Sequence, residues 1–117
     1  MMKLYNKKKA VPFILRKVYL EEYVTLTRAM LESMIVKCID ADFDYMVSCG
    51  IFKPDGSRGE YCYNKENARR HILGALIDGK PLTEGEFDDY YKLVDDYLDF
   101  NLSYLEANGL WYPIDEA

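Results

Sequence analysis

The sequence has very little of the chemistry on which most enzyme sites depend. It contains a single histidine, His71, among 117 residues. It has no Gly-rich loop that could hold a phosphate, and neither a G-x-S-x-G nor an H-E-x-x-H motif occurs. One histidine with no further histidine or cysteine at ligand spacing does not make a metal site. We therefore predict a non-enzymatic protein with no catalytic residue, no cofactor and no metal.

Long apolar runs are also missing. No stretch approaches the roughly 18 apolar residues that suggest a membrane span, so we expect no membrane partner. The basic start is followed by an apolar run that is too short for a signal peptide. The three cysteines, Cys38, Cys49 and Cys62, are odd in number and irregularly spaced. We expect reduced thiols and a cytoplasmic location, with Cys38 packed in the core.

Charge is distributed unevenly along the chain. The formal net charge is −5, yet residues 1–17 carry six lysines and arginines and no acid. Residues 78–117 carry eleven acidic residues and only Lys80 and Lys92 as bases. Half of the residues are apolar, which is enough for one core. We predict a single domain over residues 1–117, with a basic lead at 1–10 and a C-terminal tail at 111–117.

The clearest element is an acidic, tyrosine-rich helix within residues 83–110. Thr83 and Glu86 have the spacing of a capping box, and Leu82 and Phe87 fit the apolar contact that accompanies it. Asn108-Gly109 suits the left-handed end of a helix. The apolar side covers more than half of the circumference, which predicts the central packing helix of the domain.

Asn101 interrupts that apolar side. Buried polar groups are normally hydrogen-bonded, so we expect its amide to bond a neighbouring backbone group. A polar residue that fixes a helix register or a dimer seam is the alternative, and it leaves a homodimer open.

The rest of the chain predicts an α+β fold. Helical spacing covers residues 20–39 and, after the cap Asn64, residues 65–78. Residues 45–52 and 59–63 flank a turn that contains Pro54-Asp55-Gly56, which is typical of a β-hairpin. Residues 13–18 favour a strand, although Pro12 could also begin a helix. We predict a short strand and a hairpin forming a small antiparallel sheet against three helices, two of them long.

Asp40, Asp42 and Asp44 have the spacing of the first ligands in an EF-hand loop. That interpretation fails because Tyr45 stands where the loop needs glycine, and Ile51 stands where it needs a bidentate glutamate. We expect these aspartates to form a turn between a helix and a strand.

The acidic helix provides the main functional hypothesis. Asp88, Asp95, Asp99 and Glu106 share one narrow arc and lie about 10, 6 and 10 Å apart along the axis. Almost no base in the sequence around them neutralises this arc, and Tyr91 and Tyr104 border it. We predict a protein that binds a basic surface of a partner protein. Such a protein could be an inhibitor that mimics nucleic acid, of the kind carried by phages or mobile elements. The simpler interpretation is that the charge only keeps the domain soluble.

A second hypothesis uses the bases instead. A basic hairpin beside a basic helix could bind nucleic acid as a wing and a reading helix. The residues concerned are Lys53, Arg58, Lys65, Arg69 and Arg70. The two hypotheses differ in whether these five bases converge on one face.

Overall fold

The protein is built mainly from α-helices. The computed structural model describes residues 5–57, 59, 63–109 and 114–115. Its elements are α1 (Lys7–Leu15), the 3-10 turn η1 (Leu20–Glu22), α2 (Arg28–Ser48), β1 (Tyr63–Asn64), α3 (Lys65–Ile77), α4 (Glu84–Ala107) and β2 (Ile114–Asp115). No helix within the described ranges is long and apolar enough to cross a membrane.

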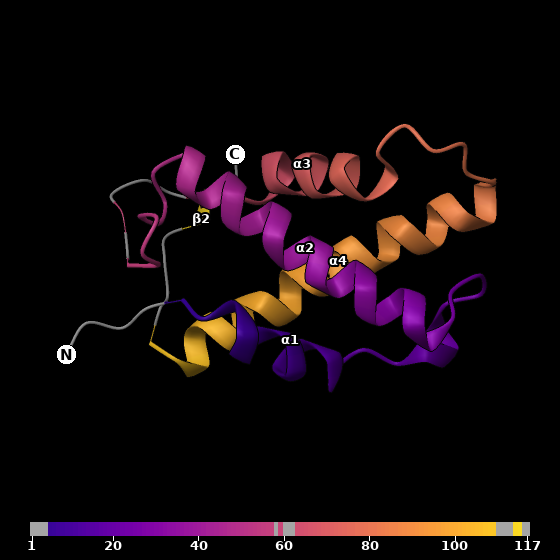
Figure 1. Ribbon diagram of the computed structural model, residues 1–117, viewed down its shortest axis with the longest axis horizontal. Coiled ribbons are helices and arrows are strands. Elements are labelled where there is room, and N and C mark those ends of the chain that lie inside the picture. Colours follow the sequence, from indigo (N-terminus) through magenta and orange to yellow (C-terminus); the bar gives the residue numbers. More distant parts are fainter. Residues whose placement is uncertain (1–4, 58, 60–62, 110–113, 116–117) are drawn as a thin grey trace.

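The two long helices, α2 and α4, cross each other, and the shorter helices lie on either side of the crossing (Figure 1). α1 packs against both long helices on one side, and α3 packs against both on the other. The molecule is elongated, with principal extents of 44 × 27 × 22 Å. The largest fully buried side chains include Leu31, Ile35 and Ile39 of α2 and Leu93 and Tyr97 of α4. Each long helix thus contributes a full apolar side to one core.

The predicted α+β fold is wrong. The strand expected within residues 13–18 lies partly in α1, which runs to Leu15, and residues 45–48 are the last turn of α2. Among the described residues, the one strand pair is β1 with β2, which run parallel and match Tyr63 to Ile114 and Asn64 to Asp115. This pairing is not the predicted antiparallel hairpin, and the remaining residues of its second strand, 60–62, lie outside the described ranges.

α2 is displaced along the sequence relative to the predicted helix over residues 20–39. Its start is fixed by Thr27, whose hydroxyl accepts a hydrogen bond from the Met30 amide at 3.2 Å. Its buried side continues past residue 39 through Asp42 and Met46. Asp42 places a carboxylate within this otherwise apolar stripe, so the sequence pattern predicts the end of the helix too early, at residue 39. The expected turn at Asp40, Asp42 and Asp44 is therefore also wrong.

The turn at residues 53–57 is confirmed, although residues 45–48 before it belong to α2 and Phe52 forms only an isolated bridge. The Gly56 amide donates to the Lys53 carbonyl at 2.8 Å, and the Ser57 amide donates to Asp55 Oδ1 at 2.9 Å. Gly56 adopts a positive φ of 88°, as the turn requires. The Ile51 amide folds back to the Met46 carbonyl at 2.8 Å. The Pro54-Asp55-Gly56 sequence therefore predicts the turn itself, but it does not predict that a helix precedes it.

α1 forms in spite of Pro12. Asn6 caps it by accepting a hydrogen bond from the Lys9 amide at 3.2 Å. Ala10 and Ile14 are fully buried, whereas Pro12 points to solvent from within the helix. The proline removes one internal hydrogen bond, and the burial of the opposite side holds the helix in place.

The ends of α3 and α4 agree with the sequence. Asn64 accepts from the Asn67 amide at 2.9 Å, as a cap for α3. Both bonds of the Thr83–Glu86 capping box are present, each at 3.1 Å. Gly109 follows α4 with a positive φ of 67°. The expected packing of Leu110 and of Trp111 to Pro113 lies outside the described residues.

A carboxylate of α4 organises the turn that precedes α2. Asp89 is 5% exposed and accepts hydrogen bonds from the Val24 amide at 3.2 Å and from the Thr25 amide and hydroxyl at 2.6 Å each. Burial alone would raise the pKa of Asp89, but the bonds from Thr25 and Val24 outweigh it and lower that pKa. The break between η1 and α2 is therefore held by a residue 64 positions away.

Replacing Asp89 with alanine should reduce the free energy of unfolding by about 2–3 kcal/mol, because three donors would lose one charged acceptor. Since the folded pKa of Asp89 is depressed, its contribution is present above the unfolded pKa and is lost as the pH falls through the folded value. Urea unfolding of the variant at pH 7 measures the loss. Asp88→Ala, one residue earlier and exposed, is the matched control. Equal effects at the two positions would contradict the assignment.

Candidate interaction surface on α4

The six residues predicted to bind a partner separate into three groups. Asp88, Tyr91, Asp99 and Glu106 are exposed. Asp95 is partly buried, with 40% of its side chain accessible. Tyr104 is only 4% exposed, and its ring packs edge-on against Tyr5 and Phe13 at centroid distances of 5.7 and 5.4 Å. Tyr104 therefore belongs to the core and cannot contact a partner.

The acidic arc is partly neutralised from within the chain. Arg69 of α3 donates through Nε to Asp95 Oδ1 at 2.7 Å and also pairs with Glu66. Lys65, one turn earlier on α3, pairs with Asp99 at 3.4 Å. The premise that almost no bases neutralise this arc is wrong for its middle. Asp88 and Glu106, at its two ends, form no ion pair with any described residue.

Two of the bases of the second hypothesis are engaged within the chain. Lys65 and Arg69 are engaged with the acids of α4. Arg70 is exposed on α3, Lys53 is exposed in the turn, and Arg58 lies outside the described residues. Of the four described bases, two are thus occupied by the same carboxylates that the first hypothesis assigned to a partner.

An exposed aromatic pair near the start of α4 was not predicted. Phe87 and Tyr91 are 43% and 40% exposed, and their rings lie 6.4 Å apart between centroids. The spacing around the capping box predicts an apolar contact of Phe87 with Leu82, yet the Phe87 side chain is exposed. Asp88 is exposed and lies one turn before Tyr91, so it neighbours Tyr91 on the helix surface, about 100° around the helix from Phe87. We call Phe87, Asp88 and Tyr91 the α4 patch.

Arg69 shows how this surface holds a guanidinium group. Its Cζ lies 5.8 Å from the centroid of the Tyr91 ring, while its Nε bonds Asp95. Burial opposes the charged form, yet the bond and the charge of Asp95 outweigh it and raise the pKa of Arg69. The guanidinium is thus held between a ring and a carboxylate, which is a favourable combination for arginine.

Asn101 is buried and hydrogen-bonded, but its partners are side chains rather than backbone groups. Its amide nitrogen donates to Asp42 Oδ2 at 3.3 Å, and its oxygen accepts from the Tyr5 hydroxyl at 2.8 Å. Asp42 also accepts from Tyr97 at 2.6 Å and from Tyr63 at 2.7 Å. We call Tyr5, Asp42, Tyr63, Tyr97 and Asn101 the Asp42 cluster.

Burial of the Asp42 cluster shifts its acid–base behaviour. Asp42 is fully buried, and this desolvation raises its pKa to about 6 in spite of the bonds from Tyr97, Tyr63 and Asn101. Burial likewise raises the pKa of Tyr97 and of Tyr5. The hydrogen bonds of the cluster connect α2, α4, β1 and the N-terminal segment. Because Asp42 is fully buried, its carboxylate is not accessible to a substrate.

The expected free thiols are present at the two cysteines that the structure describes. Cys38 is fully buried, as expected, and burial raises the pKa of its thiol, so it is a poor nucleophile. Cys49 is a free, exposed cysteine. Cys62, the third, lies outside the described residues.

No protein-family model, curated protein or solved structure matches this chain. Within the described ranges, no group of three histidine, cysteine, aspartate or glutamate residues could hold a metal ion. The chemistry of the α4 surface thus consists of two exposed rings in contact, one carboxylate near Tyr91 without a described ion pair, and further acids along the helix.

Proposed function

We propose that the protein is a non-enzymatic interaction protein whose α4 patch binds an arginine-bearing basic surface of a partner protein. The observation that carries this proposal is the pair of exposed rings, Phe87 and Tyr91, beside the unpaired carboxylate of Asp88. Exposed aromatic residues are common anchors of protein interfaces, and arginine is enriched on the opposing side.

Arg69 supports the choice of arginine as the partner group. It uses one side of Tyr91 and the carboxylate of Asp95. Phe87, one turn before Tyr91, and Asp88, two turns before Asp95, offer a ring and a carboxylate for which the described residues provide no base. An arginine there would gain about 0.5–2 kcal/mol from the ring alone, depending on how far it is desolvated.

The remaining acids of α4 would increase the association rate of a basic partner more than its affinity. Asp99 and Glu106 extend the negative surface along α4 and would attract a basic partner over a distance of about one Debye length, roughly 8–10 Å. Nucleic acid would be repelled by the same charges. The proposal is narrower than a full nucleic-acid mimic, because Asp95 and Asp99 already have partners on α3.

Affinity capture from the native host, followed by titration of the captured protein, tests the proposal. We expect Phe87→Ala/Tyr91→Ala and, separately, Asp88→Lys to weaken the interaction by tenfold or more, about 1.4 kcal/mol. Asp44→Lys is the matched control, because Asp44 is an exposed acid on α2 with no described ion pair. A partner that binds the double alanine variant as tightly as the wild type would place its contact elsewhere and refute the proposal.

A further inference from the structure

A groove of about 1000 Å³ lies between α1, η1 and α4. On α4 it is lined by Lys92, Asp96 and Phe100, which follow one another at intervals of four residues. Lys92 lies one turn after Asp88, so the groove borders the α4 patch, whereas Asp96 and Phe100 point away from Phe87 and Tyr91. The volume is at the upper end of the roughly 300–1,000 Å³ that small-molecule sites usually have.

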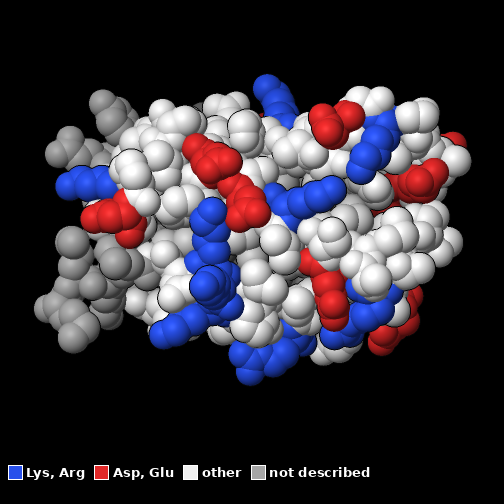
Figure 2. All heavy atoms as spheres, in the orientation of Figure 1, with Lys and Arg blue, Asp and Glu red and all other residues white. Residues whose placement is uncertain are grey.

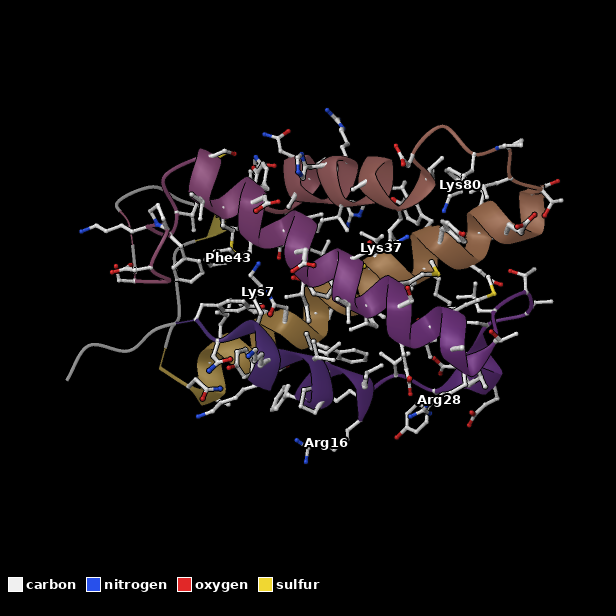
Figure 3. The ribbon with its side chains drawn as sticks, viewed as in Figure 1. Lys7, Arg16, Arg28, Lys37, Phe43 and Lys80 are labelled. Atoms are coloured by element: carbon white, nitrogen blue, oxygen red, sulfur yellow. The ribbon has the colours of Figure 1, made fainter. Side chains whose placement is uncertain are left out.

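Two bases directly after α1 provide positive charge on one wall of the groove. Arg16 and Lys17 line the groove, and neither forms an ion pair with a described residue. Arg16 donates only its Nε, to the Pro12 carbonyl at 3.1 Å, which leaves its terminal nitrogens available. Figure 3 shows Arg16 extending away from the body at the end of α1, whereas Lys7 points toward α2, where it pairs with Asp40. Figure 2 shows the Lys and Arg side chains gathered along the edge formed by α1.

The groove also offers aromatic surface. Tyr19 is 58% exposed, and Phe13 and Phe100 are partly buried beside it. The Lys17 ammonium lies 5.1 Å from the centroid of the Phe13 ring, so cation and ring are adjacent. Exposed rings next to free cations are what a planar, negatively charged ligand requires.

Two of the remaining lining residues, Glu22 and Asp96, are hydrogen-bond acceptors, and Lys92 lies between them. Lys92 bridges Asp96 Oδ2 at 3.0 Å and Glu22 Oε2 at 3.4 Å, and its own charge is thereby satisfied. Tyr23 donates to the same Asp96 oxygen at 2.5 Å. The second oxygen of each carboxylate has no bond to the described part of the chain, and it can accept from an N–H or O–H group of a ligand.

We propose that this groove binds a nucleoside phosphate. The phosphate would lie at Arg16 and Lys17, the base would stack on Tyr19, and the sugar hydroxyls or base N–H groups would donate to Glu22 and Asp96. A fatty acid offers no such donors, and inorganic phosphate would leave the rings unused. The ligand of the groove is negatively charged, whereas the partner of the α4 patch is positively charged. The nucleotide proposal therefore does not depend on the proposed function of the α4 patch.

Titration of the full chain with AMP, followed by amide chemical shifts, tests this site. We expect saturable shifts confined to residues 13–22 and 92–100. Arg16→Gln/Lys17→Gln should weaken AMP binding at least tenfold, and Tyr19→Ala should weaken it about tenfold by removing the stacking surface. Lys8→Gln/Lys9→Gln is the matched control, because it removes the same charge from exposed positions of α1 outside the groove. Circular dichroism confirms that each variant is folded.

Titrations with further ligands distinguish a free nucleotide from adenosine, from inorganic phosphate and from a strand of nucleotides. AMP binding more than tenfold tighter than both adenosine and inorganic phosphate supports the combined site. A short oligothymidylate that binds with the same residue shifts and more tightly than TMP would assign the groove to a strand of nucleotides rather than a free one. No saturable binding of AMP at 10 mM, phosphate that binds as tightly as AMP, or an equal loss in the Lys8/Lys9 control would each overturn the proposal.

Discussion

Replacing Asn101 with leucine should lower the free energy of unfolding by about 3 kcal/mol, because it leaves a buried hydroxyl without an acceptor and a buried carboxylate with one donor fewer. Leucine would make the apolar side of α4 continuous, but it would remove two hydrogen bonds. The Tyr5 hydroxyl donates to Asn101 at 2.8 Å, and the Asn101 amide donates to Asp42 at 3.3 Å.

Urea unfolding of Asn101→Leu beside wild type measures this effect. Ser103→Leu is the matched control, because it makes a comparable gain in helix propensity at a partly buried position outside the Asp42 cluster, and it should change stability by no more than about 0.5 kcal/mol. Wild-type stability in Asn101→Leu would show that the cluster contributes little beyond the space it fills.

The stability of the protein should fall with rising pH through the titration of Asp42. Its folded pKa is about 6 and its unfolded pKa is near 3.9, so the folded state holds the proton over the interval between them. The unfolded state binds fewer protons there, and the slope of unfolding free energy against pH is negative. Between pH 3 and pH 7 this group alone should remove about 3 kcal/mol.

The difference in unfolding free energy between wild type and Asp42→Asn isolates this group from the other carboxylates. That difference should move against the wild type as the pH rises from about 4 to about 7 and then level off. The neighbours that face Asp42 do not titrate in this range, because burial raises the pKa of Tyr5, of Tyr97 and of Cys38. A difference that does not change with pH would mean that the tyrosine bonds fully compensate the burial of Asp42.

Local signals predicted the ends of α3 and α4 well. The Asn64 cap, the Thr83–Glu86 capping box and Gly109 after α4 all act on neighbours within four residues, so the sequence contains everything they need. The turn around Gly56 was recognised for the same reason.

The errors arose where distant residues decide the local structure. Asp42 completes the buried stripe of α2 only because Tyr63, Tyr97 and Asn101 donate to it from elsewhere in the chain. The break before α2 depends on Asp89. Without these partners, an aspartate in a stripe is typical of a turn, and residues 45–52 are as typical of a strand as of a helix. The exposure of Phe87 and Tyr91 could not be predicted, because helical spacing identifies the apolar side of α4 but not how far along that side the neighbouring helices pack.

The length of α4 also separates the α4 patch from the opposite end of the molecule. The short strand β2 lies toward one end of the long axis, and the start of α4 lies at the other (Figure 1). The 24 residues of α4 span about 36 Å. Attachment through the end that contains β2, whether to a sensor surface or to another protein, would therefore leave Phe87, Asp88 and Tyr91 at the free end of the molecule, oriented toward whatever approaches from solution.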